Sequence, residues 1–165
     1  MTTAIANMDI HDIARLAKTY GLRGFYVINP ISAQRALAQE IIDHWRKGYG
    51  ATYNKSRKDA FELVSLKESL DEVTTEIETQ SGHAPKTIIT SANFNEGYLT
   101  FTSLRKMLKS NNLPYLLIFG TGSGIACEIV NSADYRLEPI KGSGDYNHLA
   151  VRSAVAIIID RIMRN

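Results

Sequence analysis

Apolar side chains recur at two spacings along this chain, and the two spacings alternate. Between residues 9 and 21 they recur every three or four positions, which predicts an amphipathic helix that ends at Gly21. Further helices are predicted at 32–48, with Ser32 as the N-cap, at 69–82, with Ser69 as the N-cap, and at 100–111 and 149–163. A short helix is also expected after the glycine-rich turn near residue 120.

Short apolar runs lie between these helices and predict strands. They span residues 24–28, 60–66, 86–92, 115–119 and 134–140, and segment 49–59 is predicted to be a loop. Strands that alternate with helices predict crossover connections and an α/β fold, with a mostly parallel sheet that has helices on both faces. No linker-like or low-complexity stretch interrupts the pattern. A single domain over residues 1–165 is therefore expected.

Composition narrows the class of protein only slightly. The net charge is +2, so any basic surface for nucleic acid must be local. A lone cysteine, Cys127, gives no internal disulfide and is expected to be a small buried residue. The start of the chain lacks a signal-peptide pattern, and no apolar run reaches the length of a membrane span, so we expect a cytoplasmic protein with no membrane partner. The four histidines show no ligand spacing, and no metal site is predicted.

The glycine-rich turn carries Gly120, Gly122 and Gly124 directly after an apolar strand. Bare backbone at the carboxyl end of a parallel strand suits a nucleotide-like ligand. The dinucleotide fingerprint fails, because Ile125 stands where its third glycine belongs, and no P-loop lysine follows. A dinucleotide-dependent oxidoreductase and a turn without any ligand remain alternatives.

Segments "LLIFGTGSGIACEIVNSADYRLEPI" and "YNHLAVRSAVAIIIDRI" resemble the cofactor-binding half of the SPOUT RNA methyltransferases. Segments 8–30, 43–61 and 85–92 resemble a bacterial branch of that family made of the catalytic domain alone. The resemblance implies a deep C-terminal trefoil knot, with a knotted cofactor-binding region at about residues 87–165, and a homodimer formed through the knot. It also implies S-adenosylmethionine (SAM) as cofactor and RNA, tRNA or rRNA, as substrate.

The same resemblance implies that SAM lies bent between three loops. The residues expected around it are Thr90, Ser91 and Ala92, then Gly120, Thr121 and Gly122, then Leu137, Ile140, Tyr146, Asn147 and Leu149. Leu137 and Ile140 are expected to enclose the adenine through backbone groups and apolar contact.

Four positions depart from the ribose-methylating SpoU-type branch. Arg15 matches that branch, but Asp9 replaces its asparagine, the glycine turn lacks its glutamate, and Ala150 and Arg152 replace its final asparagine and serine. Methylation of a base nitrogen is therefore somewhat favoured over the ribose 2′-oxygen, and a non-catalytic SAM- or RNA-binding protein is an alternative.

Candidates for catalysis lie at both ends of the chain. Arg15 is expected to bind phosphate or orient the target, Asp145 or His148 to act as general base, and Arg152 to stabilise developing charge. Asp9 and Asp12 are expected to complement the helix dipole rather than to act as bases. The RNA-binding residues expected besides Arg15 are Arg46, Lys47, Lys55, Arg57 and Lys58, interleaved with Tyr49 and Tyr53.

Overall fold

The computed structural model describes residues 4–94, 96–122, 124–144 and 146–164. The chain divides into two compact units, which meet in sequence between Val73 and Thr74. Each unit is described by itself below.

The first unit contains a parallel pair of strands and four helices. Along the chain these are α1 (Asn7–Thr19), β1 (Phe25–Ile28), α2 (Ser32–Arg46), α3 (Tyr49–Tyr53), α4 (Lys55–Phe61) and β2 (Val64–Lys67). Strand β1 pairs with β2 in a register that places Phe25 opposite Val64. The apolar face of α1 packs Ile10 into a core that also contains Ile42 and Phe61. Burial of this face explains why α1 forms where the apolar spacing predicts a helix.

Two expectations for this unit are wrong. Segment 49–59 is not a loop but forms α3 and most of α4, and the predicted strand at 60–66 begins only at Val64. The start of α4 is fixed by Asn54, whose side chain accepts a hydrogen bond from the Arg57 backbone N–H at 3.0 Å.

The N-cap of α2 is also displaced by one residue from the prediction. Ser32 is the first helical residue and Ile31 occupies the cap position, without a side-chain cap. Asn29, which is buried, accepts a hydrogen bond from the Ile31 N–H at 2.9 Å through its side chain. An asparagine turn before the helix thus takes the place of the expected serine cap.

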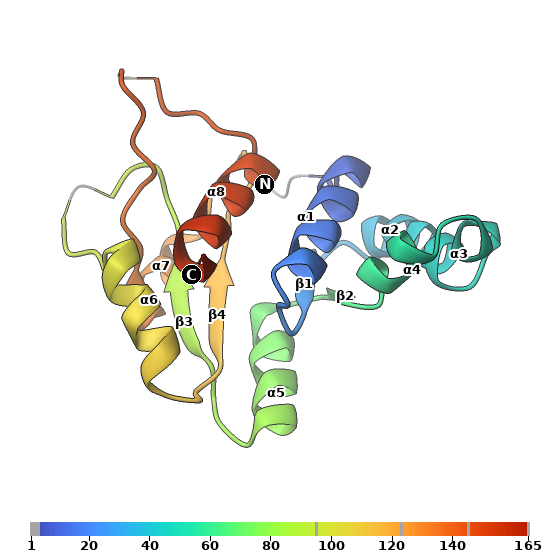
Figure 1. The fold of residues 1–165 in the computed structure, drawn as a ribbon, viewed down its shortest axis with the longest axis horizontal. Helices are drawn as coiled ribbons and strands as arrows, with labels where there is room; N and C mark the ends of the chain where they lie inside the picture. Colours follow the sequence, from blue (N-terminus) through green and yellow to red (C-terminus); the bar gives the residue numbers. More distant parts are fainter. Residues whose placement is uncertain (1–3, 95, 123, 145, 165) are drawn as a thin grey trace. The chain divides into compact units, whose positions relative to one another are not determined.

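The second unit is built on a three-stranded parallel sheet (Figure 1). Helix α5 (Leu70–Ser81) leads into it, and β3 (Lys86–Ile89), α6 (Phe101–Ser110), β4 (Tyr115–Ile118), α7 (Cys127–Ser132), β5 (Tyr135–Arg136) and α8 (Val151–Met163) follow. The strand order is β4-β3-β5, so β3, the first of these three strands along the chain, lies in the middle of the sheet. The cap predicted for α5 is confirmed, because Ser69 Oγ accepts from the Glu72 N–H at 3.3 Å.

Burial in this unit follows the predicted apolar pattern. Ile88 and Ile89 of the middle strand are buried, and α8 buries Val155 and Ile158 while it packs beside α6. The α/β fold with parallel sheets is therefore confirmed. Cys127, expected to be buried, is exposed at the start of α7. None of the helices formed by the described residues is long and apolar enough to cross a bilayer.

Candidate functional site

The three parallel strands of the second unit bring three loops to one edge of the sheet. Ile89, the last residue of β3, pairs with Ile118 on β4 and with Arg136 on β5. Neighbouring strands lie roughly 4.8 Å apart, so the residues that follow these three positions are adjacent. The loop after β3 therefore lies between the glycine turn and the loop after β5.

Thr90 joins the first two of these loops. Its backbone N–H donates to the Ile118 carbonyl at 3.1 Å, and its hydroxyl donates to the same carbonyl at 2.9 Å. Ser91 Oγ in turn accepts from the Asn93 N–H at 3.1 Å, while Ala92 is exposed. The Thr90–Ala92 loop is thus fixed at its root and open to solvent beyond it.

The glycine turn is closed by a short antiparallel bridge. Gly124 donates its N–H to the Thr121 carbonyl at 2.7 Å and adopts a φ of 75°, which favours glycine. A Cβ on Gly120 would lie 2.8 Å from Ile125 Cγ1, whereas a Cβ on Gly122 would meet nothing within 4 Å. Gly120 is therefore required by the turn itself, while Gly122 exposes bare backbone to open space.

The loop after β5 is held by its backbone. Leu137 donates its N–H to the Ile89 carbonyl at 2.9 Å, and its side chain is completely buried. Because this side chain is buried, we expect Leu137 to meet a cofactor through its main chain, and the expected apolar contact from its side chain stays a prediction. Glu138 accepts from the Phe101 N–H at 2.5 Å and so fixes the start of α6 beside this loop.

A side-chain amide connects the last predicted segment to the loop after β5. Asn147 Nδ2 donates to the Ile140 carbonyl at 3.0 Å, which brings residues 146–149 next to residues 137–140. The Tyr146 and His148 rings meet edge to face with centroids 5.3 Å apart, and Tyr146, His148 and Leu149 are exposed. The predicted cofactor residues thus lie on three neighbouring strand ends and on a fourth segment bonded to one of them.

The candidates for catalysis are divided between the two units. His148 lies in this fourth segment, and Arg152 is half-buried in the first turn of α8. Arg15 is exposed on α1, in the unit that does not contain the three loops. Asp145 lies outside the described residues.

Two of the predicted RNA-binding arginines have structural contacts instead. Arg46 donates from Nε to the Phe61 carbonyl at 2.8 Å and from Nη2 to the carbonyls of Glu62, at 3.2 Å, and Val64. The Arg57 guanidinium lies over the Trp45 ring, 4.6 Å from its centroid. Both side chains connect α2 with α4, and we therefore leave them out of the phosphate-binding set proposed below.

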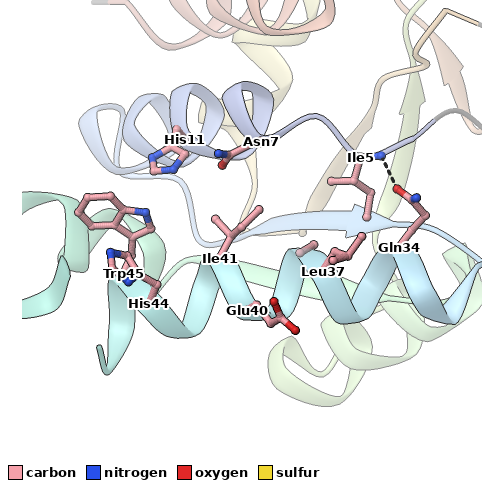
Figure 2. Close-up of a pocket in the computed structure, with 10 residues that line it drawn as sticks. Ile5, Asn7, His11, Gln34, Leu37, Glu40, Ile41, His44 and Trp45 are labelled. Carbon is pink, nitrogen blue, oxygen red and sulfur yellow. Dashed lines mark hydrogen bonds between the residues drawn. The ribbon is translucent and has the colours of Figure 1, made fainter. Parts of the chain in front are cut away.

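An open groove between α1 and α2 was not predicted from the sequence. Its volume is about 620 Å³, and Figure 2 shows His11, Ile41 and Trp45 among its lining residues. His11 meets the Trp45 ring edge to face at 5.4 Å. Burial lowers the pKa of the His11 imidazole below its usual value, and the Arg57 cation lowers it further. No short motif marks such a groove, because its walls come from separate helices.

A second feature missed from the sequence joins the starts of β3 and β5. Asp134 accepts from Lys86 Nζ at 2.7 Å and from the Thr87 N–H and hydroxyl, each at 2.9 Å. Partial burial alone would raise the pKa of Asp134, but these hydrogen bonds hold that pKa below its usual value. The same hydrogen bond and charge raise the pKa of Lys86. No three His, Cys, Asp or Glu side chains gather as metal ligands in the described parts of the chain.

A family model described as SAM-dependent RNA methyltransferase matches residues 1–164. The chain belongs to this family. Within it, an uncharacterised protein of Aquifex aeolicus is 41% identical over 162 residues, which are 98% of this chain and 79% of the relative. The family's cofactor is SAM, so this protein is a SAM-dependent methyltransferase by family, and the resemblance seen in the sequence is confirmed.

A longer relative shares the domain. A tRNA (guanine-N(1)-)-methyltransferase of Oleidesulfovibrio alaskensis is 40% identical over 163 residues, which are 99% of this methyltransferase but only 38% of that protein. Among solved structures, the SpoU methyltransferase AviRb from Streptomyces viridochromogenes, in complex with AdoMet, superposes with a TM-score of 0.60. It is 18% identical, and the match covers 98% of this chain and 57% of AviRb, so this likeness concerns the fold alone.

Proposed function

We propose that this protein transfers a methyl group from SAM to a base nitrogen of tRNA or rRNA in the cytoplasm. The observation that carries the proposal is the arrangement of the residues after β3, β4 and β5. Membership of the family supplies the reaction class, and the three adjacent loops supply a place for the adenosyl cofactor. Ligands of parallel α/β sheets bind at this edge.

The residues at the edge of the sheet fit an adenosyl group. Gly122 exposes backbone to open space, Thr121 offers an exposed hydroxyl, and Ile140 is half-buried beside Asn147. Thr90 to Ala92 would lie near the methionine and ribose parts, Gly120 to Gly122 near the ribose and adenine, and Leu137 would contribute main-chain groups only. SAM bound there supplies an activated methyl group.

The protein's own contribution is positioning and proton removal. Methyl transfer needs the acceptor in line with the departing sulfur, and holding reactants in that geometry accounts for much of the rate. A base nitrogen that loses a proton needs a general base nearby, for which Asp145 and His148 are the candidates. Arg15 would hold a phosphate of the RNA with its planar guanidinium, and Arg152 would stabilise developing charge.

The departures at Asp9, Ala150 and Arg152 support the base nitrogen as acceptor. They stand where the resemblance implies other residues in the ribose-methylating branch. The name of the Oleidesulfovibrio relative states that that protein methylates a base nitrogen of tRNA, which also favours a base nitrogen as the acceptor here. Because the shared part is 38% of that protein, we extend neither guanine nor tRNA from it to this chain.

We extend the proposal to the assembly and the chain path. Residues 1–165 act as one SPOUT domain, the region at about 87–165 is threaded as a trefoil knot, and two copies associate through it. A light-scattering mass equal to two chains is expected. A mass equal to one chain would overturn the proposed dimer.

The function is tested by comparing modified nucleosides in RNA from a deletion strain and its parent. Mass spectrometry should detect one methylated nucleoside that is missing from the deletion strain and that purified protein with labelled SAM restores. Titration calorimetry should detect binding of SAM and no binding of NAD. Binding of SAM without any methyl transfer would favour a non-catalytic binding protein, and binding of NAD alone would favour an oxidoreductase.

Arg15 is tested in the same assay. Arg15→Ala should lower methyl transfer about 10-fold or more, through loss of a charged hydrogen bond to RNA, and leave SAM affinity unchanged. Lys18→Ala, an exposed change on the same helix, serves as the matched control and should be fully active. Equal activity of the two variants would remove Arg15 from the site.

A further inference from the structure

Two tyrosine rings on α3 are exposed side by side. Tyr49 and Tyr53 are each 75% exposed, and their rings stack with centroids 6.1 Å apart and planes inclined by 19°. They lie one helical turn apart, so the short helix presents both rings on neighbouring positions of its surface. Large aromatic surface left in water at two adjacent positions is typical of a binding surface rather than of a core.

The helix that carries these rings is firmly anchored. A Cβ on Gly50, between the two tyrosines, would lie 2.7 Å from Trp45 Cε3 and 2.9 Å from His44 Cδ2, so α3 packs directly on the end of α2. Asn54 then caps α4 immediately after Tyr53. The exposed rings are therefore presented by a backbone that packing has already ordered, which lowers the entropic cost of binding.

The segment that carries the tyrosines is basic. Residues 46–58 contain five basic side chains and no acidic one. Arg46 and Arg57 are held by internal contacts, and Lys47 forms a 3.4 Å ion pair with Asp43. Lys55 and Lys58 make no ion pair within the described parts of the chain. Lys55 is exposed and Lys58 is half-buried, and both lie close in sequence to the tyrosine pair.

We propose that Tyr49 and Tyr53 form a stacking platform for unpaired nucleotides of the RNA substrate, with Lys55 and Lys58 contacting the adjoining phosphates. The inference rests on the proposed function and names its substrate class, which is RNA in a loop, bulge or single strand. Bases stack on aromatic side chains only when they are free of a duplex, and stacking of this kind tolerates any base. Protein interfaces are depleted in lysine, so the flanking charges favour RNA over a protein partner.

Filter binding with radiolabelled RNA tests the platform. The probes are an unstructured oligoribonucleotide of about 12 nucleotides, within the range of single-strand site sizes, and the blunt duplex of the same sequence. The intact protein should bind the single strand at least about 10-fold more tightly than the duplex. Tyr49→Ala and Tyr53→Ala should each weaken single-strand binding about 10-fold, whereas Tyr49→Phe and Tyr53→Phe, which keep the ring, should bind like the wild type.

Salt dependence separates stacking from charge. Lys55→Ala and Lys58→Ala should each reduce the slope of log affinity against log salt by about 0.7, because each removes one phosphate contact. The tyrosine variants should leave that slope unchanged. Lys109→Ala, an exposed lysine at the end of α6, is the matched control and should alter neither affinity nor slope.

The outcomes distinguish this inference from the proposed function. Equal binding of single strand and duplex, or wild-type affinity in both alanine variants, would overturn the platform while methyl transfer to cellular RNA still stands. Loss of a dimer in Tyr49→Ala or Tyr53→Ala, measured by sedimentation, would identify the pair as a protein interface and also overturn it. Absence of methyl transfer by the wild type would refute the proposed function whatever the binding result.

Discussion

Two glycines in the turn after β4 differ in their surroundings. The space next to Gly120 is filled by Ile125 and by the Gly124 backbone, which would lie 2.8 and 2.9 Å from an added Cβ. The space next to Gly122 is open. One glycine therefore serves the turn, and the other leaves room for what binds there.

Alanine at these two positions should have different effects. Gly120→Ala should lower both the free energy of unfolding, by about 1–3 kcal/mol through overpacking, and the affinity for SAM. Gly122→Ala should leave stability unchanged and weaken SAM binding alone, because its methyl group enters the space proposed for the cofactor. Urea unfolding and titration calorimetry measure the two quantities.

Gly142→Ala is the control for this pair, since its Cβ also meets nothing within 4 Å and it is not among the proposed cofactor residues. It should change neither quantity. Unchanged SAM affinity in Gly122→Ala would place the cofactor away from this turn.

Arg46 shows how one cation can stabilise the end of a helix. Its guanidinium donates to carbonyls at and just beyond the end of α4, two of them from Phe61 and Glu62. Arg46→Ala should lower the free energy of unfolding by about 2 kcal/mol, since hydrogen bonds from a charged donor are lost. Denaturant unfolding followed by circular dichroism measures this.

The neighbouring Lys47→Ala is the matched control for stability. Its ion pair with Asp43 is solvated, with the lysine side chain 78% exposed, and such pairs contribute less than about 1 kcal/mol. If Arg46→Ala were as stable as Lys47→Ala, the carbonyl contacts of Arg46 would be energetically unimportant.

At the scale of elements, the shortest strand depends on a single carboxylate. Strand β5 contains only Tyr135 and Arg136, and Asp134 directly before it bonds to Lys86 and Thr87 at the start of β3. This contact fixes the register of β5, and with it the position of the loop at Leu137.

Asp134→Asn should therefore lower the free energy of unfolding by about 1 kcal/mol near pH 7, because charged hydrogen bonds are lost at a partly exposed site. The folded-state pKa of Asp134 is depressed, so its contribution is complete above the unfolded pKa and is lost as pH falls through the folded pKa. The difference between wild type and variant should vanish well below about pH 4. Urea unfolding from pH 2 to 7 measures it, and a difference that is independent of pH would contradict this account.

Elements with a clear apolar period could be predicted from the sequence, and those without one could not. Helices α1, α2, α6 and α8 each have a buried stripe, and they appear where the pattern places them. Helices α3 and α4 were missed because Gly50 and Asn54, which fix them, also favour loops. The apolar run that begins at Ala60 was taken for a strand because a short run does not distinguish a helix end from a strand.

The site was predictable to a similar extent. Strand order in a parallel sheet brings the loops at 90, 120 and 137 to one edge, which the alternation of elements predicts. The sequence could not show which candidate side chains make contacts inside the protein and so are not free to bind a ligand. The contacts of Arg46 and Arg57 depend on backbone carbonyls and an indole ring that reach them only after folding, and Leu137 points into a core that the motif does not reveal.

At the scale of the whole molecule, the division into two units predicts that SAM changes hydrogen exchange in one unit only. All of the proposed cofactor residues belong to the unit that begins at Thr74, so SAM should slow hydrogen exchange at 90–92, 120–122, 137–140 and 146–149. Exchange in α2 and α3 should be unaffected by SAM. Mass-spectrometric exchange at saturating SAM measures this, and S-adenosylhomocysteine should give the same pattern. Protection confined to residues 4–73 would contradict the proposed site.

The setting of Trp45 has a practical consequence. It is the chain's single tryptophan, it lies in the first unit, and its ring contacts Arg57, His11 and Phe61. Its fluorescence emission is therefore a built-in reporter of that unit alone, free of any label. Emission and far-ultraviolet ellipticity recorded on one denaturation curve will coincide if both halves of the polypeptide melt together, and will separate if each melts independently.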